Sequence, residues 1–482
     1  MKYIKISIVI LLVSFISIFA YKLTTNNSSN KLSLTKEQMK EMISYTIDGN
    51  STSSMPTKGS GYKVKSITCK SGSILTWDND NWLLEVEKLE SEDLCNIDFT
   101  TGTGSYTVTA VPSIAGSLDS TSKTTTENGQ VTFYTKLVID SVSGCTNEIS
   151  DGKVIIKNVT SNTTCNINVS YMKLYDKLLA DNPTRPGART SFSSTLTSNN
   201  TKTLYTSTEN GTTVYYFAGN ATDNWVQFGG YYWRIIRTNS DGGVRLLYHG
   251  TSTTAENAYI GESAFNNSYN NIAYVSYMYG STGSIANART NQTNSSTIKT
   301  AIDNWYKDNL NTNYGKYLST TAVYCNDRST SDNTYFGAYT RLKTNKTPSY
   351  DCAATEDKFT ADTSTGNGKL TYPIALMTAD EVSFAGGLWG TNAQTWYYYN
   401  SAKGSSTGEQ WWWLLSPASG NGSYAYVFFV VGSSNPGFLS STYVSHTYGV
   451  RPAVSLKSCV KTSGGDGSAS APYTIVETET GC

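Results

Sequence analysis

The chain reads Gly230-Tyr231-Tyr232-Trp233-Arg234-Ile235-Ile236-Arg237, then Ser240-Asp241-Gly242-Gly243, and then a short run from Val244 to Tyr248. Both outer runs are rich in aromatic and branched residues, which favour strands. The Asp-Gly-Gly between them is a turn signal of the kind that joins paired strands. This stretch therefore predicts a β-hairpin, and we expect the hairpin to belong to a larger unit that runs from about 190 to 460.

Helix signals in this larger unit are few. One helix is predicted from Thr297 to Leu310, because Ile298, Ile302 and Trp305 recur at helical spacing. A second is predicted after Thr378-Ala379-Asp380-Glu381, a capping box, and it should stop at the next pair of glycines. The remainder reads as strand and turn. The fold class expected is α+β, mainly β, with a twisted and mainly antiparallel sheet.

An internal repeat occupies the part of the chain before this unit. Cys95-Asn96-Ile97-Asp98-Phe99 returns as Cys165-Asn166-Ile167-Asn168-Val169, and a similar charged segment precedes each copy. In both copies the Cys, the Ile and the Phe or Val fall at alternate positions, which places them on one buried face of a strand. Strand-like runs also end at or near Cys69 and Cys145. We therefore expect two small β modules, each held by its own disulfide.

The eight cysteines fall into neighbouring pairs along the chain. The count is even and no CxxC is present, which is more typical of disulfides in an oxidising compartment than of a zinc site. Eight reduced and buried thiols are the alternative if the chain is not exported. The expected bridges are Cys69–Cys95, Cys145–Cys165, Cys325–Cys352 and Cys459–Cys482.

The N-terminus has the pattern of an export signal. Lys2 and Lys5 precede an apolar run from Ile6 to Tyr21, and a polar stretch follows. Ala20 suits a cleavage site, but Ile18 does not, so a cleaved signal peptide and an uncleaved membrane anchor both remain open. We expect an extracellular protein, either anchored to the membrane at the cell surface or secreted.

Composition limits the classes of partner. Lysine plus arginine equals aspartate plus glutamate, so the net charge is zero and nothing directs the chain toward nucleic acid. The many tyrosines and tryptophans, among Ser, Thr, Asn and Gly, are typical of a β-rich exterior protein.

The parts expected along the chain are a signal peptide or anchor (1–22), a stalk (23–61) with a helix from Leu34 to Tyr45, β module 1 (62–104), β module 2 (105–171), a linker with a short helix (172–199), the large domain (200–460) and a disulfide-pinned tail (461–482).

Four phrases of the large domain resemble a known family. They are Phe228-Gly229-Gly230-Tyr231-Tyr232-Trp233-Arg234-Ile235-Ile236-Arg237, Met377-Thr378-Ala379-Asp380-Glu381-Val382, Trp412-Trp413-Leu414-Leu415-Ser416-Pro417 and Tyr448-Gly449-Val450-Arg451-Pro452. The family is an uncharacterised domain of surface proteins from low-GC gut bacteria. It is distantly similar to formylglycine-generating (sulfatase-modifying) enzymes and to the Fibrobacter-type paralogous domain. The resemblance covers roughly 200–460 and implies a C-type-lectin-like fold.

Candidate catalytic and metal-binding groups are scarce. The two histidines, His249 and His446, have no second His and no Cys close in sequence, so each is expected to be a packing or solvated residue. The enzymes named above use paired thiols to bind copper, and Cys325 with Cys352 would be the candidates here. The sequence around these two cysteines does not match the enzyme's active-site phrase. We expect a non-enzymatic protein without a cofactor or a metal.

The remaining candidate is an aromatic surface. Trp411, Trp412 and Trp413 are consecutive, so in a strand they cannot all face one side, and Tyr398 and Tyr443 lie in neighbouring aromatic segments. The leading hypothesis is that these rings bind host or bacterial glycans or surface proteins, as in adhesion. The rings could instead fill the core. The alternative functions are an enzyme of the formylglycine-generating type that uses Cys325 and Cys352, and a structural envelope protein without a ligand.

Overall fold

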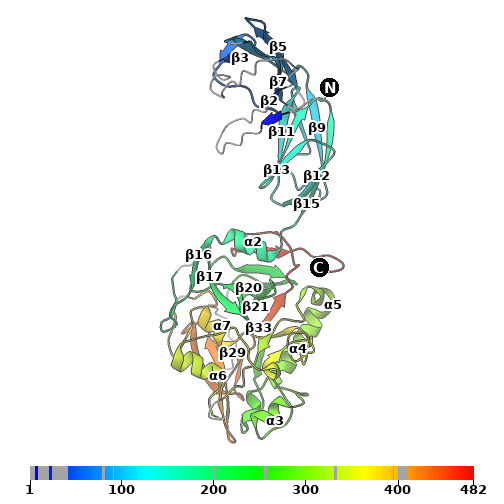
Figure 1. The fold of residues 1–482 in the computed structure, drawn as a ribbon. Helices are drawn as coiled ribbons and strands as arrows, with labels where there is room; N and C mark the ends of the chain where they lie inside the picture. The colour runs from blue at the N-terminus through cyan, green and yellow to red at the C-terminus, as the bar shows by residue number, and fades with distance from the viewer. Residues whose placement is uncertain are drawn as a thin grey trace. The chain divides into compact units, whose positions relative to one another are not determined.

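The computed structural model describes the 482-residue chain except for residues 1–5, 9–20, 24–41, 79–81, 91, 199–200, 255–257, 331–333, 395 and 400–410. The chain divides into two compact units, Met1–Ser170 and Tyr171–Cys482, which we call the N-terminal and C-terminal units and describe separately (Figure 1). Both units are mainly β, as the sequence predicts. Among the residues described, no helix is long and apolar enough to cross a membrane.

The first half of the N-terminal unit contains two small sheets. One has the strand order β4-β3-β8-β5, and the other has the order β1-β2-β7-β6. The strands are β1 (Ile6–Ile8), β2 (Tyr21–Leu23), β3 (Ile43–Ile47), β4 (Asn50–Thr52), β5 (Tyr62–Cys69), β6 (Ile74–Asp78), β7 (Leu83–Lys88) and β8 (Cys95–Thr101). In β8, Cys95, Ile97 and Phe99 are buried and alternate with half-buried polar residues. The alternation predicted from the sequence is therefore confirmed.

The second half repeats this plan. Its sheets have the orders β10-β9-β15-β12 and β11-β14-β13. The strands are β9 (Tyr106–Pro112), β10 (Ser122–Thr125), β11 (Gly129–Tyr134), β12 (Val138–Ser143), β13 (Asn147–Ser150), β14 (Lys153–Val159) and β15 (Thr163–Ser170). In β15, Cys165, Ile167 and Val169 are buried in the core of this half.

The two halves share one topology as well as one sequence pattern. In each, the first strand of the four-stranded sheet, β3 or β9, pairs in parallel with the last, β8 or β15. The other edge of that last strand pairs antiparallel with β5 or β12. The expected disulfides Cys69–Cys95 and Cys145–Cys165 are both formed: the first joins the end of β5 to the start of β8, and the second joins the segment just after β12 to β15. The repeat read in the sequence is thus a repeat of structure.

Two expectations for the first residues do not hold as stated. Residues 43–52, which we assigned to a stalk, form β3 and β4, because Ile43, Tyr45 and Ile47 pack against the core of the first half. The helix expected from Leu34 to Tyr45 lies outside the described residues as far as Glu41, and its last three residues lie in β3 instead. The export segment 1–22 also lies outside the described residues, apart from β1 and the first two residues of β2.

Two sheets form most of the C-terminal unit. The larger has the order β16-β17-β18-β20-β19-β35-β34, with β21, β33 and β27 continuing from β20, and the smaller has the order β22-β32-β29-β30-β31-β28. The strands of the larger sheet are β16 (Thr184–Ala188), β17 (Thr203–Glu209), β18 (Thr212–Tyr216), β19 (Trp225–Phe228), β20 (Tyr231–Thr238), β21 (Val244–Gly250), β27 (Ile374–Leu376), β33 (Pro452–Leu456), β34 (Thr462–Gly464) and β35 (Tyr473–Ile475). Those of the smaller are β22 (Glu262–Ala264), β28 (Leu388–Trp389), β29 (Trp411–Gly420), β30 (Ala425–Val431), β31 (Phe438–Tyr443) and β32 (Thr447–Gly449). Two short pairs join β23 (Met278–Tyr279) to β24 (Asn294–Ser295) and β25 (Tyr324–Cys325) to β26 (Lys358–Phe359).

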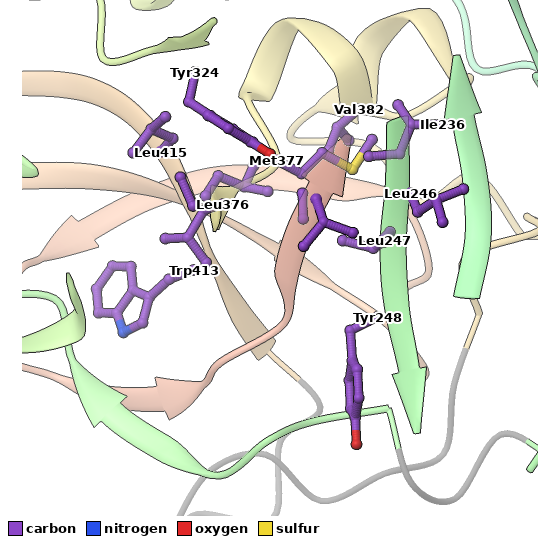
Figure 2. Packing of buried hydrophobic residues seen from close by; sticks show 14 of the residues in the cluster. Ile236, Leu246, Leu247, Tyr248, Tyr324, Leu376, Met377, Val382, Trp413 and Leu415 are labelled. Carbon is purple, nitrogen blue, oxygen red and sulfur yellow. The ribbon is translucent and has the colours of Figure 1, made fainter. Parts of the chain in front are cut away.

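The predicted hairpin is confirmed as β20 and β21, which pair antiparallel. Asn239 N–H donates to the Gly243 carbonyl at 2.8 Å, and Gly242 takes a positive φ of 79° that suits glycine in such a turn. Strand β21 is buried along its whole length, and β20 and β33 pair with its two edges. Figure 2 shows Leu246 and Leu247 of this strand in the same core as Met377 and Val382.

Helices are short and few among the described residues of this unit. They are α2 (Leu174–Asp181), α3 (Ile285–Arg289), α4 (Thr297–Asn309), α5 (Asn311–Tyr314), α6 (Gly337–Tyr339) and α7 (Ala379–Phe384), with 3-10 turns η2 (Ile272–Val275), η3 (Gly315–Tyr317) and η5 (Thr355–Asp357) and the π-helical η4 (Thr340–Asn345). Helix α4 has the predicted bounds within one residue, but Tyr306 joins Ile298 and Ile302 in the core while Trp305 stays half-buried. The capping box of α7 is formed: Glu381 N–H donates to Thr378 Oγ1 at 3.1 Å, and Thr378 N–H donates to Glu381 Oε2 at 2.9 Å.

The last residues of the chain do more than form a pinned tail. The expected disulfides Cys459–Cys482 and Cys325–Cys352 are both formed. In addition, β34 and β35 extend the larger sheet, because β35 pairs in parallel with β19. The segment 461–482 is therefore an integral part of the C-terminal unit.

Candidate ligand-binding cleft

An open cleft of about 470 Å³ lies in the C-terminal unit, and we call it the aromatic cleft. The residues that line it come from segments far apart in the sequence. They are Asn220, Ala221, Thr222, Trp225, Arg234, His249, Thr253, Gln394, Trp396, Tyr397, Tyr399 and Ala469. The volume suits a small molecule or a few sugar units, and the mixture of rings with a few polar groups is typical of ligand sites.

Neighbouring strands of the larger sheet bring three of these side chains together. Trp225 opens β19 and is the cross-strand partner of Arg234 in β20. His249 lies near the end of β21, and its ring meets the Trp225 ring edge-on at 4.5 Å between centroids. The Arg234 guanidinium lies 4.1 Å from the centre of the Trp225 ring. The pairing of the hairpin with β19 therefore builds one wall of the aromatic cleft.

A turn at residues 396–399 builds the other wall. The Trp396 indole donates to the Ala385 carbonyl at 3.0 Å, and the Tyr397 hydroxyl donates to the Phe217 carbonyl at 3.2 Å. These bonds hold both rings in buried positions. Tyr399, two residues on from Tyr397, is 47% exposed. It is the ring in this wall that offers a free face to a ligand.

His249 is buried and uncharged. Burial, together with the nearby charges of Arg451 and Arg234, lowers its pKa well below the ordinary value. An arginine only donates, so the 2.8 Å contact from Arg451 Nη2 assigns Nδ1 as the acceptor and places the ring proton on Nε2. Nε2 makes no hydrogen bond of normal geometry to the described residues. The Thr254 backbone interacts with the ring and acts to raise its pKa, against the lowering by burial. His249 is therefore a buried, neutral ring whose remaining N–H lies near the Thr254 backbone.

Two buried arginines flank His249. Arg234 donates from Nε to Asn224 Oδ1 at 2.7 Å and from Nη2 to the Ala221 carbonyl at 2.9 Å. Arg451 donates from Nε to the Tyr248 carbonyl at 2.7 Å and makes the contact with His249 described above. Burial lowers the pKa of Arg234 to about 9 and that of Arg451 to about 10, so both stay protonated at neutral pH. Neither forms an ion pair with a described residue.

A second cavity, of about 20 Å³, is too small for a ligand and could hold about one water. Buried ion pairs surround it. Glu381 bonds to Arg237 at 3.0 Å and to Arg245 at 2.8 Å, and Arg237 also bonds to Glu209 at 2.8 Å. We call these four residues the Glu381 network. Burial raises the pKa of Glu209, but Arg237 outweighs this effect and lowers it to about 2.

The aromatic residues singled out in the sequence lie in several environments. Trp412, Trp413 and Tyr398 are completely buried, so their rings fill the core. Trp411 and Tyr443 stay half-buried. The predicted strand parity is confirmed, because Trp411 and Trp413 both contact the Tyr448 ring while Trp412 packs against Arg451 on the other face.

The buried rings nevertheless lie close to the aromatic cleft. The Arg451 guanidinium is 5.1 Å from the centre of the Trp412 ring and 5.7 Å from that of Tyr398. Arg451 in turn contacts His249, which lines the aromatic cleft. Trp412 and Tyr398 therefore form the layer behind this cleft, and Tyr443 belongs to a separate surface cluster with Tyr269 and Tyr426.

Sequence reasoning pointed to the aromatic segment Trp396–Tyr399 as a neighbour of the tryptophan run, but it missed the other residues of the aromatic cleft. It treated His249 as a packing or solvated residue, and it quoted Arg234 and Arg451 only as parts of family phrases. The signal that could have found them is an arginine within an otherwise apolar or aromatic strand. Arginine is almost never fully buried unless it is paired, so an arginine in such a strand calls for a partner or a function. Trp225 carried no such signal.

Metal or thiol chemistry finds little support in the residues described. The disulfide between Cys325 and Cys352 leaves neither thiol available to copper. Within the described part of the chain, the one close group of potential metal ligands is Cys69, Asp93 and Cys95, and its two cysteines are bridged to each other.

Comparison with known proteins adds one match. No curated protein and no solved structure matches the chain. One family model matches residues 253–458, and its description is "Domain of unknown function (DUF6273)". The match includes Trp396, Tyr397 and Arg451, whereas Trp225, Arg234 and His249 precede it. Three of the four sequence phrases lie within the match, and the phrase at 228–237 precedes it. A domain of unknown function, DUF6273, therefore covers residues 253–458 of this chain.

Proposed function

We propose that this chain is an exported, non-enzymatic surface protein whose C-terminal unit binds carbohydrate in the aromatic cleft. The observation that carries the proposal is the cleft itself: about 470 Å³, lined by four aromatic rings and by convergent polar groups of Asn220, Arg234 and Gln394. Aromatic faces pack on the apolar faces of sugars while side-chain amides and cations meet the hydroxyls. A lectin-like fold, which the family resemblance implies, suits the same role.

The chemistry of the lining favours binding over catalysis. The described residues that line the aromatic cleft include no carboxylate and no thiol. Hydrolysis of a glycosidic bond commonly needs two carboxyl groups. His249 is not placed as a general base, because its Nδ1 already accepts from Arg451. Recognition without turnover is the function that this set of residues supports best.

The rest of the chain fits a surface location in this proposal. Four disulfides favour an oxidising compartment. The apolar segment near the N-terminus would direct export and, if uncleaved, tether the chain to the membrane. The two disulfide-closed halves of the N-terminal unit would act as a spacer between the membrane and the C-terminal unit.

A glycan array probed with the full chain, exported into an oxidising compartment, tests the proposal. Tyr399→Ala should then weaken binding to the best array ligand by about fivefold or more, because an exposed ring at the centre of a contact contributes about 1 kcal/mol or more. The melting temperature should stay the same. Tyr269→Ala is the matched control, since this tyrosine is 46% exposed outside the aromatic cleft.

Three outcomes would count against the proposal. Absence of any glycan ligand would remove it. A loss of binding in Tyr269→Ala but not in Tyr399→Ala would move the site to the tyrosine cluster around Tyr443. Turnover of a bound glycan would contradict the non-enzymatic assignment.

A further inference from the structure

The buried arginines of the C-terminal unit are of two kinds. Arg237, Arg245 and Arg328 each form an ion pair with a buried carboxylate. Arg234 and Arg451 are equally buried, at 5% and 0% exposure, yet neither has a carboxylate partner among the described residues. A buried charge without a partner is costly, and proteins seldom keep one without a use.

Arg234 is the member of the second kind that lines the aromatic cleft. Its Nε and Nη2 are held by Asn224 and Ala221, but no hydrogen bond from Nη1 is formed to the described residues. The ring of Trp225 at 4.1 Å and the ring of Tyr397 at 5.4 Å fix the plane of the guanidinium. Such ring contacts attract a cation without neutralising it. The side chain is therefore oriented in advance and keeps a donor to offer.

The surroundings of Arg234 leave its charge largely uncompensated. Arg451 adds a second positive charge that acts on Arg234. His249, which contacts Arg451, is neutral. The acidic group whose charge acts on Arg234 is Asp223, whose Oδ2 accepts from the Lys202 backbone and whose Oδ1 has no hydrogen-bond partner among the described residues. Burial raises the pKa of Asp223, and Asp223 and Arg234 form no ion pair. The described lining of the aromatic cleft contributes no carboxylate.

We infer that the aromatic cleft selects acidic sugars, and that Arg234 binds the carboxylate or sulfate group of the ligand through Nη1 while Tyr399 stacks on the sugar ring. This inference rests on the proposed function and narrows it to one ligand class. Charge-assisted bonds in a partly desolvated site are among the stronger polar contacts.

The test compares acidic glycans with neutral glycans of the same backbone, on the full chain at low salt. Sialyllactose is paired with lactose, a galacturonate trimer with a galactose trimer, and a sulfated oligosaccharide with its desulfated form. The wild type should bind the acidic member of at least one pair about tenfold more tightly, and salt should reduce the difference. The pair that shows the preference identifies carboxylate or sulfate.

Variants then locate the preference. Arg234→Gln should abolish the preference, so that the acidic and the neutral member of the pair bind equally. Arg185→Gln removes one exposed charge elsewhere in the unit and should leave the preference intact. Thr222→Asp serves if Arg234→Gln does not fold, because Thr222 is exposed in the lining. The new carboxylate should repel the acidic ligand or occupy Arg234, and the neutral, similarly sized Thr222→Asn should keep the preference.

The outcomes separate the inference from the proposed function. Equal binding of acidic and neutral members by the wild type would overturn the inference and leave the proposed function standing. No binding of either member would overturn both. An acidic preference that survives both Arg234→Gln and Thr222→Asp would place the anion elsewhere and refute the assignment to Arg234.

Discussion

The Glu381 network and the aromatic cleft use the same type of residue in opposite ways. Arg237 and Arg234 lie three residues apart in β20, and both are buried. Arg237 is enclosed by Glu209 and Glu381, so its charge is satisfied within the protein. Arg234 has ring faces and a carbonyl around it, and it borders open space. Burial alone therefore does not distinguish a structural arginine from a binding one; the distinguishing feature is the source of the counter-charge.

The largest effect is expected from Glu381→Gln. Glutamine can keep the capping box of α7, but it removes the negative charge that pairs with both Arg245 and Arg237. Breaking a buried pair by removing one partner typically costs about 3–5 kcal/mol. Urea unfolding would measure this loss. A loss below about 1 kcal/mol would mean that the network contributes no more than a surface ion pair.

A direct comparison of the two arginines should give unequal losses. Arg237→Gln leaves Glu209 buried without its main partner and should also cost about 3–5 kcal/mol. Arg234→Gln strands no described carboxylate and loses hydrogen bonds worth about 1.5–3 kcal/mol. Both unfolding free energies can be measured by the same urea titration. Equal losses would show that Arg234 has an internal partner as strong as Glu209, and the contrast would fail.

Thr378→Ala separates the cap from the charges. The substitution removes the acceptor for Glu381 N–H and leaves the ion pairs in place. The expected cost is about 1 kcal/mol, as for other N-cap replacements. A loss equal to that of Glu381→Gln would show that the cap, and not the charge, accounts for most of the stability around Glu381.

The smallest expected effect is a change in how stability depends on pH. The folded pKa of His249 is depressed, so the unfolded chain binds more protons as pH falls below about 6.5, and stability decreases there. Glu209, with a folded pKa of about 2, contributes stability that is present above its unfolded pKa and is lost as pH falls through the acid range toward 2.

Unfolding free energies of the wild type and of His249→Gln, measured from neutral to acid pH, would resolve these two windows. The variant should lose the decrease that begins near 6.5 and keep the decrease at lower pH. Identical pH profiles would show that His249 titrates as an ordinary histidine and is not held neutral beside Arg451 and Arg234.

Local signals in the sequence predict a good part of this fold. The hairpin at β20 and β21, the helices α4 and α7, the four disulfides and the repeated strands β8 and β15 all follow from contacts between residues near in sequence or from a period of two or 3.6. Strand β3 was missed because its pairing partner β8 lies about fifty residues on, and a polar context hid the alternation of Ile43, Tyr45 and Ile47.

The candidate site depends on contacts that the sequence does not show. Trp225, Arg234, His249 and Trp396 meet only when the sheet and the 396–399 turn are assembled. The Trp411–Trp413 run illustrates the same limit, since its parity could be predicted but not its burial. Strand β29 pairs with β30 on one edge and with β32 on the other, and Trp412 and Trp413, which point to opposite faces, are both completely buried.

The parallel pairing of β3 with β8, and of β9 with β15, has a mechanical consequence. When the chain is pulled from its two ends, the two strands of each parallel pair are drawn in opposite directions along their shared edge. All the hydrogen bonds between them then bear load together. Rupture then requires breaking the whole ladder at once, not one bond after another. The disulfides, which close spans of 26 and 20 residues, keep on the order of 150 Å of chain from being stretched out at about 3.4 Å per residue. Each half of the N-terminal unit should therefore resist force and limit extension, whichever role the unit serves.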